Sequence, residues 1–245
     1  MKPKKDTSQH VVQKDKLKGQ LNLKPLNWTP RQKEFLELAL NKKTRIIFVN
    51  GPAGSTKTIM SVYAGLEMIN QKKISDMMYL RSAVESSDSG LGFLPGDVDQ
   101  KISLYGIPLS DKLEELLGYS DIQILQKEER IQIMPVNFVR GQSWNARLAI
   151  VDEAQNMTEE EIFTILTRIG KFSKGFILAD PTQSDLKNKN KTGAFKRLAQ
   201  YFTNAKGQEG GIHYFEFQKQ DIMRDDLTKL LVELREDMIN AEKQT

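Results

Sequence analysis

Short apolar runs alternate with longer stretches that begin with helix-start signals along most of the chain. The short runs are rich in β-branched residues, which is typical of buried strands. The predicted strands are 44–50, 76–81, 131–135, 147–151, 174–179 and 213–217, and the predicted helices are 29–40, 57–70, 98–104, 111–117, 158–169, 194–201 and 225–241. Because strands alternate with helices, the expected fold class is α/β, with a largely parallel sheet flanked by helices.

Two of the predicted helices begin at capping boxes. Thr29 is followed three residues later by Gln32, with Pro30 at the first helical position. Thr158 is followed in the same way by Glu161. A Thr side chain and a Gln or Glu side chain at this spacing satisfy each other's backbone N–H groups, so both helix starts are well defined.

The composition is that of an ordinary globular protein, with 245 residues, 39% hydrophobic and 28% charged. No apolar run approaches the roughly 20 residues that cross a bilayer. The N-terminal lysines have no apolar block after them, so we expect no signal peptide and a cytoplasmic location. The chain has no cysteine and two distant histidines, which excludes disulfides and thiolate sites and argues against a histidine metal cluster.

The net charge of +4 is concentrated at the N-terminus. Residues 1–25 contain seven lysines and two aspartates and carry +5, so the remainder carries −1. We therefore expect a basic, unfolded tail over 1–25 and a single domain over 26–245. The tail is either an electrostatic arm for nucleic acid or a solvated leader. The near-neutral remainder, with 8% aromatic residues in the chain, predicts no basic-aromatic platform for nucleic acid.

A phosphate-binding loop is predicted directly after the strand 44–50. Its residues are Gly51, Pro52, Ala53, Gly54, Ser55, Thr56, Lys57 and Thr58, and they open the helix 57–70. In this context, successive backbone N–H groups and the helix N-terminus form a cradle for phosphate oxygens. Lys57 is expected to reach the β- and γ-phosphates of ATP, and Thr58 to place its hydroxyl on Mg²⁺. The plain alternative is a strand–turn–helix with a chance Lys-Thr pair.

One residue of this loop departs from the usual motif. Thr56 occupies a position where glycine is usual. If the position requires a positive φ, a β-branched residue is strained there by a few kcal/mol. The loop is then either rearranged or weaker in binding phosphate.

Two further strands end in polar groups of a kind that nucleotide hydrolysis uses. Residues 148–151 lead into Asp152 and Glu153, a Walker B arrangement in which Asp152 holds Mg²⁺ through water and Glu153 polarises the attacking water. Residues 176–179 lead into a segment that contains Gln183, which could contact the γ-phosphate or the lytic water. The structural alternative for Asp152 and Glu153 is a pair of solvated carboxylates just before a helix. For the segment with Gln183 it is a Pro-containing turn.

Together these motifs resemble the PhoH family of P-loop ATPases, the phosphate-starvation-inducible proteins. The resemblance runs from about residue 30 to 231. Beyond the nucleotide motifs it is carried by Leu91–Asp97 (LGFLPGD), Phe138–Ser143 (FVRGQS), Asp152–Asn156 (DEAQN), Thr167–Gly170 (TRIG) and Asp221–Arg224 (DIMR). The chain departs from the family pattern at Thr56, Ala179 and Ser82.

The resemblance implies a RecA-like core related to superfamily 1 helicases. It implies Mg²⁺-dependent ATP hydrolysis coupled to single-stranded nucleic acid, RNA or DNA with RNA favoured, and makes a bacteriophage source plausible. Gln32 aligns with the glutamine that reads adenine, and Arg140 and Arg168 with positions near phosphate or nucleic acid. The alternative function is a nucleotide-binding sensor or scaffold with little turnover.

The resemblance also bears on assembly. Superfamily 1 helicases enclose ATP between two cores, one of which supplies an arginine finger, and this chain has residues for one such core. We therefore expect a homo-oligomeric ring, hexameric by analogy, in which Arg224 acts on the ATP of a neighbouring subunit. The structural alternative is an Arg224 that pairs with Asp225 or Asp226 on its own helix.

Overall fold

The structure is a computed structural model. It describes residues 15–81, 106–139, 141, 143–180 and 193–222, and, of the C-terminal helical segment, residues 227, 230, 231, 233, 234, 237 and 238. The expected helix 98–104 lies outside the described residues, as does much of the expected helix 225–241.

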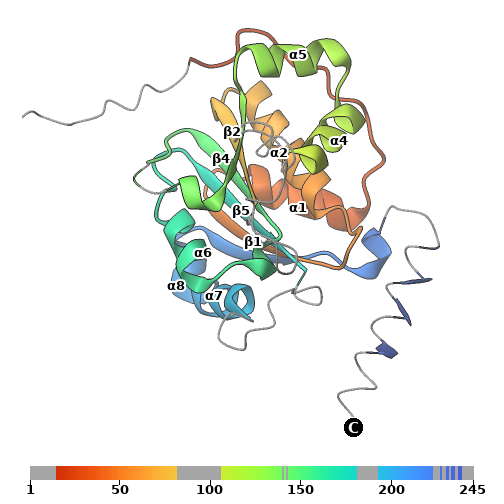
Figure 1. Ribbon diagram of the computed structural model, residues 1–245, viewed down its shortest axis with the longest axis vertical. Helices are drawn as coiled ribbons and strands as arrows, with labels where there is room; N and C mark the ends of the chain where they lie inside the picture. Colours follow the sequence, from red (N-terminus) through yellow and green to blue (C-terminus); the bar gives the residue numbers. More distant parts are fainter. Residues whose placement is uncertain are drawn as a thin grey trace, which may run out of the picture.

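One six-stranded sheet forms the centre of the molecule (Figure 1). Its strands are β1 (Ile46–Asn50), β2 (Asp76–Arg81), β3 (Ile131–Pro135), β4 (Arg147–Asp152), β5 (Lys174–Ala179) and β6 (Ile212–Glu216). They are ordered β3-β2-β4-β5-β1-β6, and all pairings among them are parallel. The structure thus confirms the predicted α/β class with a parallel sheet.

Helices cover both faces of the sheet (Figure 1). They are α1 (Pro30–Leu40), α2 (Lys57–Asn70), α4 (Ile107–Leu116), α5 (Tyr119–Lys127), α6 (Glu159–Leu166), α7 (Ala194–Phe202) and α8 (Ala205–Glu209), with short 3-10 turns at Val136–Phe138, Ala154–Asn156 and Lys219–Asp221. Helices α1, α2, α4 and α5 share one hydrophobic core, and α6 and α7 share the other. None of the helices in the described part of the chain combines the length and apolar character that a bilayer crossing needs.

Both cores are built from alternate residues of the same strands. In β1, Ile47 and Val49 face the α1–α2 side, whereas Phe48 faces the α6–α7 side. Successive strand side chains point to opposite faces, so a strand covered on both faces must be apolar at every position. This explains why the strands appear in the sequence as continuous apolar runs.

The element boundaries agree with the sequence in most places, and both predicted capping boxes are present. The helix predicted over 111–117 spans Ile107–Leu116, and the helix predicted to run to 169 ends at Leu166. Helices α5 and α8 were not predicted. Neither begins with the capping-box signal that marked α1 and α6.

The expected start of order near Leu26 is wrong. Leu17 and Leu21 are buried in the α1–α2 core, only 2% and 3% exposed. The Lys24 amide donates to the carbonyl of Leu116, and the Asn22 amide donates to the carboxylate of Asp121. Residues 15–25 therefore run along α4 and α5 as part of the folded molecule (Figure 1). The error arose because lysines around two leucines gave this segment the composition of a solvated tail.

We expect Leu17→Ala and Leu21→Ala each to destabilise the protein by about 2 kcal/mol or more, because both remove buried methyl groups from a packed core. Urea unfolding of each variant measures this change. Lys16→Ala is the matched control, since its side chain is exposed and should change the free energy of unfolding by less than about 0.5 kcal/mol. Equal stabilities for all three variants would mean that residues 15–25 do not contribute to the core.

Candidate nucleotide site

The strand order brings three chain segments together at one edge of the sheet. Strands β4, β5 and β1 are adjacent, and Val151 pairs with Ile177 while Ala179 pairs with Asn50. Because the strands are parallel, their carboxyl ends lie side by side, where ligands bind in open α/β sheets. The glycine-rich loop, the Asp152–Glu153 pair and Asp180 all follow these ends.

The glycine-rich loop connects β1 to α2. A Cβ at Gly51 would lie 3.0 Å from Phe217 Cβ, a tight contact, so glycine suits the close approach of the chain after β6 to the loop. Helix α2 begins at Lys57, so the N–H groups of its first turn are directed toward the loop. A helix N-terminus preceded by such a turn is suited to bind an anion.

Thr56 has a left-handed conformation, with φ +65° and ψ 10°. This confirms that the position requires a positive φ, which strains a β-branched residue by about 1–3 kcal/mol. The Thr56 hydroxyl accepts a hydrogen bond of 3.0 Å from Gln32 Nε2. A buried side chain of α1 therefore holds the strained residue in place.

Gln32 belongs to a hydrogen-bonded network that extends beyond the loop. It is fully buried, and its Oε1 accepts from the Thr29 amide in the capping box of α1. The Thr29 hydroxyl in turn donates to Asp221 Oδ1 at 3.0 Å. The network therefore connects the loop to Asp221, the first residue of the block that contains Arg224.

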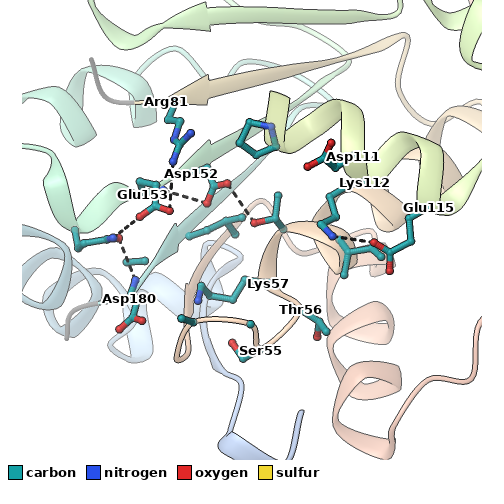
Figure 2. Close-up of a pocket in the computed structure, with 18 residues that line it drawn as sticks. Ser55, Thr56, Lys57, Arg81, Asp111, Lys112, Glu115, Asp152, Glu153 and Asp180 are labelled. Atoms are coloured by element: carbon teal, nitrogen blue, oxygen red, sulfur yellow. Dashed lines mark hydrogen bonds and ion pairs between the residues drawn. The ribbon is translucent and has the colours of Figure 1, made fainter. Parts of the chain in front are cut away.

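Lys57 points into the site from the start of α2 (Figure 2). Its Nζ donates to the carbonyls of Gly51 at 2.6 Å and Pro52 at 2.9 Å. Burial lowers the pKa of Lys57, and the charges of Asp180, Asp152 and Glu153 partly oppose that effect. These three carboxylates favour the charged form of the amine, which is the form that binds phosphate.

Thr58 and Asp152 form a pair of oxygen ligands suited to Mg²⁺. Thr58 Oγ1 lies 3.2 Å from Asp152 Oδ2, and the hydroxyl of Tyr79 also donates to Oδ2. Mg²⁺ prefers hard oxygen ligands and usually keeps several waters. A hydroxyl beside a carboxylate fits a nucleotide-bound Mg²⁺ contacted by Thr58 and, through water, by Asp152. Burial and the Asp152 charge raise the pKa of Tyr79, so its hydroxyl stays protonated and donates.

Glu153 also has a left-handed conformation, with φ +56°. Gln155 Nε2 donates to Glu153 Oε2 at 2.5 Å, and Gln155 Oε1 accepts from the Asp180 amide at 3.0 Å. Arg81 Nη2 lies 3.6 Å from Glu153 Oε1. Burial and the adjacent Asp152 charge raise the pKa of Glu153, whereas Gln155, Arg81 and Lys57 oppose that rise. A carboxylate with a raised pKa is a stronger base, as proton abstraction from water requires.

These groups line one cavity of about 430 Å³, a volume typical of small-ligand sites. Helix α4 forms the wall that faces the loop and contributes Asp111, Lys112 and Glu115, with Lys112 and Glu115 paired at 2.8 Å (Figure 2). Nothing in the sequence indicated that α4 would reach the site. Gln155 belongs to the motif Asp152–Asn156, but only the fold places Arg81 beside Glu153 and joins Gln155 to the Asp180 amide.

The structure brings most of the predicted site residues together. The cavity is lined by Ala53, Gly54, Ser55, Thr56, Lys57, Thr58, Asp152 and Glu153, with Gly51 and Pro52 directly behind it. Gln32 contacts the site through Thr56. Arg168 does not line the cavity, because it follows α6 at the opposite edge of the sheet, beside Trp144. Gln183, Arg140 and Arg224 lie outside the described residues.

A glycine-rich loop between a central parallel strand and a helix, with a strand-end carboxylate beside its hydroxyl, defines a RecA-like P-loop nucleoside triphosphatase core. The chain belongs to the PhoH family, since the family model for PhoH-like proteins matches residues 24–236.

Curated relatives agree with this assignment. The chain is 35% identical over 205 residues to a PhoH-like protein of Bacillus subtilis and 33% identical over 208 residues to one of Synechocystis. These alignments cover 84% and 85% of the chain but only 62% and 61% of the relatives. Among solved structures, unliganded Pif1 from Bacteroides matches 82% of the chain and 43% of its own length, with 17% identity and a TM-score of 0.38. That likeness is too low to bear on the site.

We expect the Gln32–Thr56 hydrogen bond to stabilise the loop by about 1 kcal/mol. Thr56→Val keeps the branched shape but loses the hydroxyl, so it should weaken ATP binding more than Thr56→Ser, which keeps it. In the Gln32→Leu protein, Thr56→Val should weaken ATP binding less, since the amide that donates to the Thr56 hydroxyl is already absent. ATP titration of the four proteins of this cycle gives the coupling energy. Additive effects would show that the hydrogen bond does not hold the loop.

We expect the rate of ATP hydrolysis at saturating ATP to fall as the pH is lowered. The midpoint of this fall should lie at a pH above the ordinary pKa of glutamate. Glu153 must be deprotonated to take a proton, and its pKa is raised by burial and by Asp152. Because the Arg81 guanidinium lowers that pKa, Arg81→Gln should move the acid limb to still higher pH. Rates measured across a pH series test this prediction. An acid limb that stays in place, or moves to lower pH, contradicts the assignment of Glu153.

Proposed function

We propose that the protein binds ATP with Mg²⁺ and hydrolyses it at the carboxyl edge of the sheet. One observation carries this proposal: Lys57 and Thr58 of the phosphate loop share a single cavity with Asp152 and Glu153. A cation for phosphate, a ligand pair for Mg²⁺ and a base for water are the groups that phosphoryl transfer to water requires.

The residues divide the work between binding and chemistry. The N–H groups of the loop and of the first turn of α2 bind the phosphates together with the charged amine of Lys57. Thr58 and Asp152 would hold Mg²⁺, which would withdraw charge from the phosphate oxygens. Glu153 accepts a proton from the attacking water, and Gln183 contacts the γ-phosphate or that water.

We further propose that hydrolysis is coupled to single-stranded nucleic acid, RNA or DNA with RNA favoured, as the family resemblance implies. The chain spans about 60% of the length of its curated relatives, so the activity of whole relatives need not transfer to it. The strain at Thr56 favours a second candidate, a nucleotide sensor or scaffold with little turnover. The cytoplasmic location expected from the sequence stays a prediction.

We propose that the protein assembles into a homo-oligomeric ring, hexameric by analogy. A single core leaves the γ-phosphate facing solvent. In the ring, Arg224 of a neighbouring subunit supplies a cation to that phosphate. Within its own subunit, the start of the Arg224 block is bound to the N-terminus of α1 by the hydrogen bond from Thr29 to Asp221. We also propose one ATPase domain after the basic tail, with the boundary moved from Leu26 back to Asp15.

We expect Lys57→Ala to abolish ATP binding, and Glu153→Gln to retain binding but lower hydrolysis by about 10²–10⁴-fold. Lys57 binds phosphate in the ground state, whereas Glu153 acts on water only during the reaction. Calorimetric ATP titration and a phosphate-release assay separate the two effects. Glu161→Gln, on the first turn of α6, is the matched control and should hydrolyse ATP normally. Normal hydrolysis by Glu153→Gln contradicts the proposal.

We expect Arg224→Ala to lower hydrolysis by about 10³–10⁵-fold, the range known for arginine fingers. Mixing Arg224→Ala with Lys57→Ala should restore activity, because mixed rings contain interfaces in which an intact Lys57 faces an intact Arg224. The phosphate-release assay on the mixture, alongside each variant alone, tests this. Full activity of a monomeric wild-type protein at high dilution rules out a site completed by a neighbour.

A further inference from the structure

Positive charge gathers at the amino edge of the sheet, opposite the nucleotide site. The loops that precede β2, β4, β5 and β1 are residues 71–75, 143–146, 167–173 and 41–45. They contain seven Lys and Arg residues and no Asp or Glu, and the first residues of the strands add Asp76, Arg147 and Lys174. These four strands are consecutive in the sheet and lie about 5 Å apart, so their loops are neighbours. The sequence shows no basic platform because the fold assembles it from four distant segments.

Several of these cations are engaged in holding the structure. Lys174 and Lys73 donate to the carbonyls at the carboxyl end of α1, and Lys72 donates to the carbonyl of Leu17. Arg147 pairs with the buried Asp76 at 2.9 Å. The cations of this edge whose side chains are exposed are Lys42, Lys43, Arg45 and Lys171. Nearby charges of mixed sign are Lys206 and Glu209 on α8 and Glu128 and Glu129 before β3.

An exposed aromatic ring lies among these cations. Phe172 is 80% exposed and has a φ of +60°, a conformation that is a clear outlier for a bulky residue. Such strain costs about 1–3 kcal/mol and persists only where the surroundings enforce it. Because the ring faces solvent, no burial of the ring offsets the cost of this strain.

The loop that presents Phe172 is firmly held. The Lys171 amide donates to Asn145 Oδ1 at 2.9 Å, and the Lys171 carbonyl accepts from the Ala146 amide at 2.9 Å. Ser173 Oγ donates to the carbonyl of Trp144 at 2.9 Å. Arg45 Nη2 donates to the carbonyl of Gly170 at 3.0 Å, which places the β1 loop directly beside the β5 loop. The loop that carries Phe172 is therefore formed in advance of any ligand.

We propose that this amino edge binds single-stranded nucleic acid, with Lys42, Lys43 and Lys171 on the phosphates and a base stacked on Phe172. Cations that follow the backbone, together with an aromatic platform, are what sequence-tolerant single-strand binding uses. The carboxyl edge, where Asp152, Glu153 and Asp180 lie, is assigned to the nucleotide. The inference rests on the proposed coupling to nucleic acid, for which it supplies the site.

The test compares the two edges of the sheet in the full-length protein. One variant carries Lys42→Gln, Lys43→Gln and Lys171→Gln, and its charge-matched counterpart carries Lys33→Gln, Lys196→Gln and Lys219→Gln in the half of the molecule toward the nucleotide site. Fluorescence anisotropy with labelled oligouridylate, repeated over a salt series, gives affinity and salt dependence. The amino-edge variant should bind more weakly, with a log–log salt slope smaller by roughly two, since each lost contact removes about 0.7.

Phe172 is tested in the same assay. Phe172→Ala should weaken binding about fivefold or more, whereas Phe172→Trp should retain it, because a larger ring still stacks. Tyr201→Ala, which removes another exposed ring on α7, is the control and should bind as wild type does. All variants should hydrolyse ATP normally in the absence of nucleic acid.

The outcomes separate this inference from the proposed function. If the counterpart variant loses as much affinity as the amino-edge variant, or more, the amino edge is not the site. The same holds if Phe172→Ala binds normally. If the wild-type protein binds no oligonucleotide while it hydrolyses ATP, both the coupling and this site are wrong, and the ATPase assignment stands.

Discussion

The parallel pairing of β4, β5 and β1 is the constraint on which the site depends. It places the end of β1 beside the end of β5, and β5 beside β4, so that the phosphate loop, Asp152 and Asp180 meet at one edge. Separate chain segments thereby supply the cation and the carboxylates of one cavity. The same pairing brings the loops at the other end of these strands together, which gives the sheet a carboxyl edge rich in acids and an amino edge rich in lysine and arginine.

Two strained residues of the site are held by glutamine side chains. Thr56 and Glu153 both have a positive φ, and each is hydrogen-bonded by a glutamine, Gln32 or Gln155. Each glutamine also binds a backbone amide elsewhere, at Thr29 or Asp180. A glutamine can do this because its amide group both donates and accepts. The loop is therefore held by a side chain of α1, and the Glu153 carboxylate is linked through Gln155 to the end of β5.

The sequence predicted the features that are local to a few consecutive residues. The phosphate loop follows an apolar strand directly, and so does the Asp152–Glu153 pair, so both were visible without a fold. Tyr79 was not predicted as a partner of Asp152, because their contact depends on β2 lying next to β4. The contribution of α4 to the cavity wall and the burial of Leu17 were not predicted either, because both depend on packing between residues far apart in the sequence.

A crystal structure with ADP, aluminium fluoride and Mg²⁺ would show whether the carboxyl edge binds a Mg²⁺-nucleotide for hydrolysis. We expect Lys57 Nζ to leave the carbonyls of Gly51 and Pro52 and to contact the phosphates. We also expect Mg²⁺ against Thr58 Oγ1 and a water between Glu153 and the fluoride group. A nucleotide bound elsewhere, or one bound here while Lys57 keeps its contacts to the loop carbonyls, would contradict the proposed function.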